Sequence, residues 1–283
     1  MRSIRSFLTL LIRGIIEDDL WGYSNALTYK LLLALFPFLI FLMTLLGFFN
    51  LSDAAIDMSL AESVPPQISG IIDAFISEVL IERSLSLLSI SLFVTIFSAS
   101  SGFRAIIKGI NKSYETNDTR NPLVISVIAV GLVFLFAISI TICLSVLIFG
   151  DQFMAFIDWY YGVSDTAYAI YAIFRNFGVM LALLAAVCAI YKFSSYKKVS
   201  FLSVVPGSVV TVSLWVLASK IFEIYIGNFS KFSVIYGSLG SVFVMMIWLN
   251  IVSFLLLVGS EINALITVDL RLSKSKADNS SIP

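Results

Sequence analysis

Histidine is absent from this sequence of 283 residues, and only 13% of its residues are charged. Without histidine, the chain lacks the commonest general base and the commonest metal ligand of proteins. Cysteine occurs twice, at Cys143 and Cys188, and both residues lie inside apolar runs. A disulfide or a cysteine-bound metal is therefore not expected. The formal net charge is zero, so the basic excess that accompanies nucleic-acid binding is also missing.

Apolar residues dominate the sequence. They make up 59% of it, against roughly 45 to 50% in a soluble protein. Uncharged runs cover residues 31–52 and 121–150, and a helix of about 20 apolar residues crosses a bilayer core about 30 Å thick. The sequence therefore predicts an all-α, polytopic integral membrane helix bundle, a single domain over residues 1–270. Six transmembrane helices are expected, at residues 27–50, 84–104, 122–149, 171–192, 201–221 and 236–261.

Two other segments have their apolar residues on one helical face. Residues 3–16 predict an amphipathic helix in the membrane interface, and residues 67–82 predict a second one on the extracytoplasmic side. The first segment has no small-residue cleavage pattern, so we do not interpret it as a signal peptide. Residues 271–283 are polar and are predicted to form a flexible cytoplasmic tail.

Lysine and arginine are sorted between the loops. If both termini are cytoplasmic, that side carries thirteen of the 18 cations, the opposite side carries four, and Lys30 falls in the first span. Cytoplasmic loops of membrane proteins are enriched in these residues. We therefore expect a multi-pass membrane protein with cytoplasmic N and C termini.

Short motifs at the ends of the apolar runs carry a family resemblance. They lie at residues 97–104 with Asn111 and Tyr114, at 205–207 with Phe222 and Tyr225, at 236–239 with Trp248, and at 259–263. With them, residues 20–270 resemble the YihY/BrkB family, although Ser260 stands where that family generally has alanine or glycine. The resemblance implies six inner-membrane spans and an ill-defined activity, with envelope lipid or lipopolysaccharide transport suspected. Some members carry an old ribonuclease BN label.

Polar residues near the ends of the spans are the candidates for substrate binding. They are Arg104, Lys108, Asn111, Asn250, Glu261 and Asn263. Glu261 ends the sixth run at the same expected depth as Arg104 and Lys108, and a carboxylate beside an apolar interior should find a cation or be protonated. We predict that Glu261 pairs with Arg104 or Lys108. Such a pair would either clamp the cytoplasmic rim or gate a path.

Proline and glycine mark positions where the backbone is broken or closely packed. Pro37 predicts a kink in the first span. Gly102 follows a small residue by four positions, a spacing that lets another helix approach. Pro206 and Gly207 begin the fifth span and Gly237 begins the sixth. They mark either broken helices beside a substrate or an ordinary first-turn proline and a packing face.

Three functions follow from these patterns. The first is a transporter or flippase-like protein for a lipid-linked or amphiphilic anionic envelope component, whose phosphate the cytoplasmic cations would hold. The second is a non-transporting membrane organiser or envelope assembly partner. The third, a ribonuclease, is disfavoured because the carboxylates show no recognised metal-ligand spacing. We expect no enzymatic activity, no cofactor and no metal, with membrane lipids rather than nucleic acid as partners. No pattern indicates the oligomeric state.

Overall fold

The computed structural model describes residues 4–48, 85–162, 164–227 and 238–280. This part of the chain forms seven helices and no strand: α1 (Ile4–Glu17), α2 (Leu20–Phe48), α5 (Leu85–Ser113), α6 (Pro122–Tyr161), α7 (Asp165–Ser194), α8 (Phe201–Gly227) and α10 (Ser238–Ser280). Each helix from α2 onward contains a stretch long and apolar enough to cross a membrane. The predicted all-helical architecture with six spans is confirmed.

The helices are longer than the uncharged runs that predicted them. α5 continues from the apolar run through Arg104 and Lys108 to Ser113, and α10 continues to Ser280, beyond residue 270, the predicted end of the membrane domain. The helix expected at residues 3–16 is observed as α1. The amphipathic helix expected at residues 67–82 and the glycine at position 237 lie outside the described residues.

Large apolar side chains face outward on most of the spans. On α6 and α7, Val127, Phe134, Phe174 and Phe177 are all exposed. A protein in water rarely exposes a contiguous apolar surface of this kind, whereas the hydrocarbon of a bilayer solvates it at no cost. The exposure pattern therefore supports the bilayer as the solvent of these helices.

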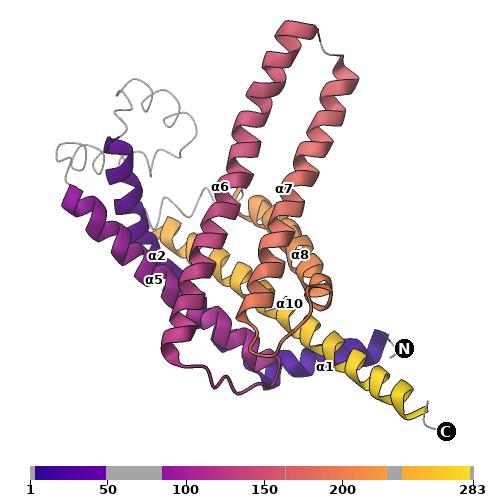
Figure 1. The fold of residues 1–283 in the computed structure, drawn as a ribbon. Coiled ribbons are helices and arrows are strands. Elements are labelled where there is room, and N and C mark those ends of the chain that lie inside the picture. Colours follow the sequence, from indigo (N-terminus) through magenta and orange to yellow (C-terminus); the bar gives the residue numbers. More distant parts are fainter. Residues whose placement is uncertain (1–3, 49–84, 163, 228–237, 281–283) are drawn as a thin grey trace.

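The helices pack as antiparallel neighbours around α10. α2 packs on α5, α6 on α7, and α8 on α10, while α10 also contacts α2, α5 and α1. Figure 1 shows α6 and α7 rising as a long hairpin, with α1 lying beside the end of α10. The start of α1, the loops after α5 and α7, and the end of α10 all gather at one end of the molecule, which we call the terminus-bearing end.

The turn at the far end of the α6–α7 hairpin has a local cause. Gly162 caps the end of α6, and its φ of 64° is in the left-handed region that glycine adopts most easily. The Ser164 hydroxyl then accepts a hydrogen bond from Ala167 N and caps the start of α7. These two residues let the chain reverse within a few positions.

The core lies near the terminus-bearing end, where α5, α7, α8 and α10 meet. Tyr191 of α7 is fully buried, and its hydroxyl group lies 2.7 Å from Thr211 Oγ1 and 2.6 Å from the Leu256 carbonyl oxygen. α8 and α10 cross at Gly207 and Gly259, where a Cβ on Gly259 would stand 2.8 Å from the Gly207 carbonyl oxygen. This contact requires the absence of a side chain on both helices.

Candidate functional site

Three cations gather between α2 and α5, and we call Lys30, Arg104 and Lys108 the basic cluster. Lys30 lies within electrostatic range of the other two. Lys108 is exposed, while Lys30 and Arg104 are half-buried. The ion pairs in the described part of the chain join other residues, so none of the carboxylates described there neutralises the cluster. Uncompensated like charges beside an apolar surface favour the binding of an anion.

Arg104 extends along α5 toward the apolar part of the helix. Its Nη1 donates to Ser100 Oγ at 3.1 Å, and its Cζ lies 5.9 Å from the centre of the Phe97 ring. Phe97 shares this face with Phe93 and Ile90, and all three are more than half exposed. One face of α5 therefore presents an apolar stripe that ends in cations. We call Ile90, Phe93 and Phe97 the apolar stripe.

Asn111, predicted to bind substrate, is instead fully engaged with the protein. It is 2% exposed. Its Nδ2 donates to the carbonyl oxygens of Ile107 and Ser194 and to Asp118 Oδ2, at 2.9 to 3.2 Å. Its Oδ1 accepts from Tyr196 N at 2.7 Å. The amide thus joins the end of α5 to the loop after α7, and both of its N–H donors are engaged within the protein.

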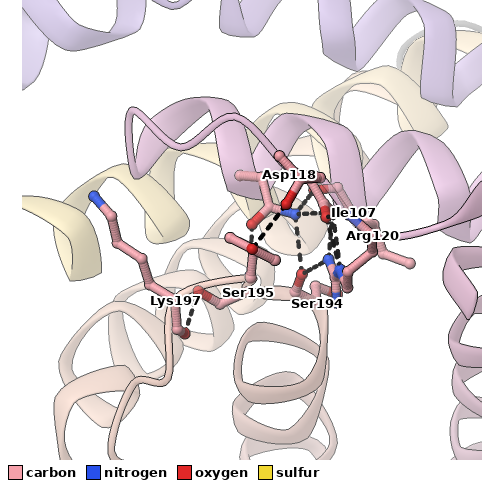
Figure 2. Close-up of polar contacts among 9 residues, drawn as sticks. Ile107, Asp118, Arg120, Ser194, Ser195 and Lys197 are labelled. Carbon is pink, nitrogen blue, oxygen red and sulfur yellow. Dashed lines mark hydrogen bonds and ion pairs between the residues drawn. The ribbon is translucent and has the colours of Figure 1, made fainter.

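A bidentate ion pair reinforces the same junction. Arg120 donates to both carboxylate oxygens of Asp118, at 2.8 and 2.5 Å, and to the Ser194 carbonyl oxygen at 3.0 Å. Figure 2 shows these groups converging on the loop that follows α7, where Lys197 also lies. The Arg120 guanidinium lowers the pKa of the Asp118 carboxyl group below its usual value. The pair closes the terminus-bearing end of the bundle.

The predicted ion pair of Glu261 with Arg104 or Lys108 is wrong. Glu261 is 4% exposed, and its carboxyl group faces Ser113 and Asp18. Helical geometry explains the error, because Arg104 precedes Ser113 by nine residues, which is about half a turn at 100° per residue. The basic cluster and Glu261 therefore lie on opposite sides of α5.

Asp18, in the short link between α1 and α2, was not among the predicted site residues. It is 8% exposed and lies 3.4 Å from Lys112 Nζ. Burial raises the pKa of its carboxyl group, and the lysine opposes that shift only in part. The only signal in the sequence is an acidic triplet, residues 17–19, after the amphipathic helix, and that signal does not show which carboxylate turns inward.

Asn263 and Asn250 bind neighbouring helices. Asn263 Oδ1 accepts from Gly207 N at 2.7 Å, directly after Pro206. Asn250 Nδ2 donates to Asn25 Oδ1 at 2.7 Å and lies 3.3 Å from Thr28 Oγ1. These amides therefore tie α10 to α8 and to α2, which gives both of them a structural use in the observed bundle.

The four proline and glycine candidates among the described residues, Pro37, Gly102, Pro206 and Gly207, lie within continuous helices. Pro37 is inside α2, and Pro206 is the sixth residue of α8. Gly102 is buried where α5 meets α2, and a Cβ there would lie 3.4 Å from Leu31 Cδ2. Arg104 and Lys108 form no ion pair within the described residues, whereas Glu261 Oε2 and Asn263 Nδ2 are buried there without a hydrogen-bond partner. Lys30 joins Arg104 and Lys108, and the only signal for it in the sequence is a charge at the start of the first span.

Six apolar helices, amide and hydroxyl contacts between the spans, and a tightly packed terminus-bearing end define this chain as a polytopic helical membrane protein. The chain belongs to the Virulence factor BrkB family, whose family model matches residues 11–281. Aromatic residues that carried the family resemblance also meet in space, since the Phe222 ring lies 4.9 Å from that of Trp248 and 5.9 Å from that of Tyr225.

Comparison with known proteins gives similar sequences of limited description. The chain is 31% identical over 243 residues to the ribonuclease-like protein YfkH of Bacillus subtilis, covering 86% of this chain and 88% of that protein. It is 30% identical over 78 residues to a UPF0761 membrane protein of Pseudoalteromonas translucida, covering 28% of this chain and 26% of that one. A UPF0761 membrane protein of Photobacterium profundum is 34% identical over 80 residues, 28% of this chain and 25% of that one. No solved structure matches.

Proposed function

We propose that this chain is a transporter or flippase-like protein for a lipid-linked or amphiphilic anion of the bacterial envelope. The observation that carries the proposal is the basic cluster at the end of the apolar stripe on α5. An amphiphile with an anionic headgroup has the same division into a charged end and an apolar end. Arginine and lysine bind phosphate through forked hydrogen bonds and point charge respectively.

The route that the structure favours runs along the outer face of α2 and α5. The centre of the bundle at the terminus-bearing end is filled by Tyr191 and by the contact between Gly207 and Gly259. The side chain of Asn250, a polar residue within the last span, donates a hydrogen bond to Asn25. A substrate would therefore slide along the lipid-facing surface, with its headgroup on the basic cluster and its chains on the apolar stripe.

The proposal includes an inner-membrane location with cytoplasmic termini. The sorting of thirteen cations to one side supports this orientation, which would place the basic cluster at the cytoplasmic leaflet. Reporter fusions at residues 115 and 160 test it. We expect the first reporter to be cytoplasmic and the second extracytoplasmic, and placement of both in one compartment would refute the topology.

Transbilayer movement of a fluorescent lipid tests the function. Purified protein in liposomes should speed the movement of headgroup-labelled phosphatidylglycerol between leaflets, and a Lys30→Gln/Arg104→Gln/Lys108→Gln variant should lose that movement. Lys220→Gln is the matched control, because Lys220 is an exposed cation that already pairs with Glu223. Equal movement by the triple variant and the wild type would contradict the proposal.

The alternative is a membrane organiser or envelope assembly partner without a substrate path. The close packing at the terminus-bearing end favours it, because a bundle held by Tyr191, Asn111 and Asn263 is rigid where a central gate would have to open. Phosphatidylglycerol that binds to the basic cluster without crossing the membrane would favour this alternative over transport.

We also propose that the chain is not an enzyme, although its relative YfkH is described as ribonuclease-like. The sequence has no histidine, and the Asp18 and Glu261 carboxyl groups that meet in the described structure are buried beneath α1. Metal-dependent cleavage of a phosphodiester needs ligands that the scissile phosphate can reach.

A further inference from the structure

Two buried carboxyl groups meet where α1, α5 and α10 join, and we call Asp18 and Glu261 the acid pair. Asp18 is 8% exposed and Glu261 is 4% exposed. Gly14 of α1 lies directly over Glu261, since a Cβ on Gly14 would come within 2.8 Å of the Glu261 Cδ atom. The acid pair is therefore closed from above by α1.

The charges around the acid pair do not balance. Lys112, a half-exposed cation, is 3.4 Å from Asp18 and is the single cation in its described surroundings. Glu115, in the turn after α5, and Glu17, at the end of α1, add further negative charge near Asp18. Glu17 forms an ion pair with Arg13. Glu261 Oε2 has no hydrogen-bond partner within the described residues.

The neutral groups around Glu261 contribute little compensation. The Ser113 hydroxyl faces it from α5, but the Ser113 Oγ atom is also 2.9 Å from Ser260 Oγ. The Tyr114 hydroxyl is buried near Glu261, and burial raises the pKa of this phenol to about 12, so it stays neutral. Two ionised carboxylates in such a site repel each other across a low dielectric, and neighbouring buried carboxyl groups respond by retaining a proton.

We propose that Asp18 and Glu261 form a proton-binding site that holds α1 against the bundle. One proton on the pair removes the repulsion and lets one carboxyl group donate to the other, while Lys112 balances the remaining negative charge. Loss of the proton leaves two negatively charged carboxylates beneath Gly14. Their repulsion weakens the packing, and α1 separates from the bundle.

The exposed side of α1 has the composition of a helix that binds a membrane surface. Its side away from the bundle carries the apolar residues Leu8, Ile12 and Ile16, all exposed. Arg5 and Arg13 lie among them on the exposed surface. A helix with this composition binds a membrane interface. The acid pair would thus convert a change of pH at the terminus-bearing end into a change in the docking of α1, whether or not the protein moves a substrate.

Cysteine labelling of α1 tests the docking. In a background with Cys143 and Cys188 replaced by serine, Leu11→Cys reports on the partly covered side of α1 and Thr9→Cys on its exposed side. The ratio of the two labelling rates removes the pH dependence that the two thiols share, and the acid-pair variants, which carry the same thiols, report any difference between them. We expect the ratio of the Leu11→Cys rate to the Thr9→Cys rate to rise about tenfold between about pH 5 and about pH 9. This range covers the pKa values that buried carboxyl groups commonly have, and a shift of one pKa unit corresponds to a tenfold change in an equilibrium constant.

Variants of the acid pair show whether a rise in the labelling ratio comes from these two carboxyl groups. Glu261→Gln imitates the protonated state, so its ratio should stay low throughout, and Asp18→Asn serves if the first variant does not fold. Glu223→Gln is the matched control and should behave as wild type, because Glu223 is exposed and paired with Lys220. Infrared difference spectra should show a protonated carboxyl band that Glu261→Gln or Asp18→Asn removes. A flat ratio in the wild type, or an unchanged rise in the acid-pair variants, would overturn the proposal.

Discussion

Replacement of Gly259 by alanine should destabilise the bundle by about 3 kcal/mol. A Cβ at this position would stand 2.8 Å from the Gly207 carbonyl oxygen and closer still to Thr211 Oγ1 and the Tyr191 hydroxyl group. Overpacking of a tight core costs about 1 to 3 kcal/mol. Displacing the Tyr191 hydroxyl would add about 1 kcal/mol for a weakened hydrogen bond. The sum corresponds to a loss of about a hundredfold in the ratio of folded to unfolded protein.

Reversible unfolding in mixed detergent micelles would measure this loss. Gly178→Ala is the matched control, because Gly178 is a helical glycine with nothing within 4 Å of an added Cβ. It should be neutral or stabilising by up to about 1 kcal/mol, since alanine is the better helix former. A Gly259→Ala variant as stable as Gly178→Ala would refute the close crossing of α8 and α10.

Three further predictions concern the polar residues. Asn111→Leu should cost about 2 to 4 kcal/mol in the same unfolding assay, because backbone groups of the loop after α7 lose their partner; a neutral effect would contradict the structural role. Because Arg120 lowers the pKa of Asp118, their interaction stabilises the fold above the unfolded pKa of about 3.9 and is lost as the pH falls through the folded pKa. The stability gap between wild type and Arg120→Gln, followed by unfolding at several pH values, should therefore shrink below about pH 4, and a constant gap would count against the pair. Purified protein should not cleave RNA, and cleavage that disappeared in Asp18→Ala/Asp19→Ala would reverse our view of the enzyme question.

The spans were predictable because a bilayer imposes one requirement, about 20 apolar residues, that can be counted along the chain. The rotation of each helix about its axis was not. Glu261 seemed close to Arg104 and Lys108 when only depth was considered, yet Ser113 and Arg104 point about half a turn apart on α5. Which of those faces meets Glu261 depends on how the helices pack. A membrane helix is apolar on all sides, so its sequence has no periodic pattern that reveals which face is buried.

The amides show a second limit of the sequence. Asn111, Asn250 and Asn263 were predicted to bind substrate because buried polar groups in a membrane are costly and often functional. The same cost is met when an amide bonds to another part of the protein, as with Gly207 N for Asn263 and Asn25 for Asn250. Sequence alone cannot separate these uses, because the partners lie more than 50 residues away along the chain.

Native mass spectrometry of lipid binding tests the central claim most directly. Protein released from mixed micelles of phosphatidylglycerol and phosphatidylcholine should retain the anionic lipid in preference to the zwitterionic one. The Lys30→Gln/Arg104→Gln/Lys108→Gln variant should lose that preference, while Lys220→Gln keeps it. Equal retention of both lipids by the wild type, or an undiminished preference in the triple variant, would contradict the assignment of the basic cluster as an anionic headgroup site.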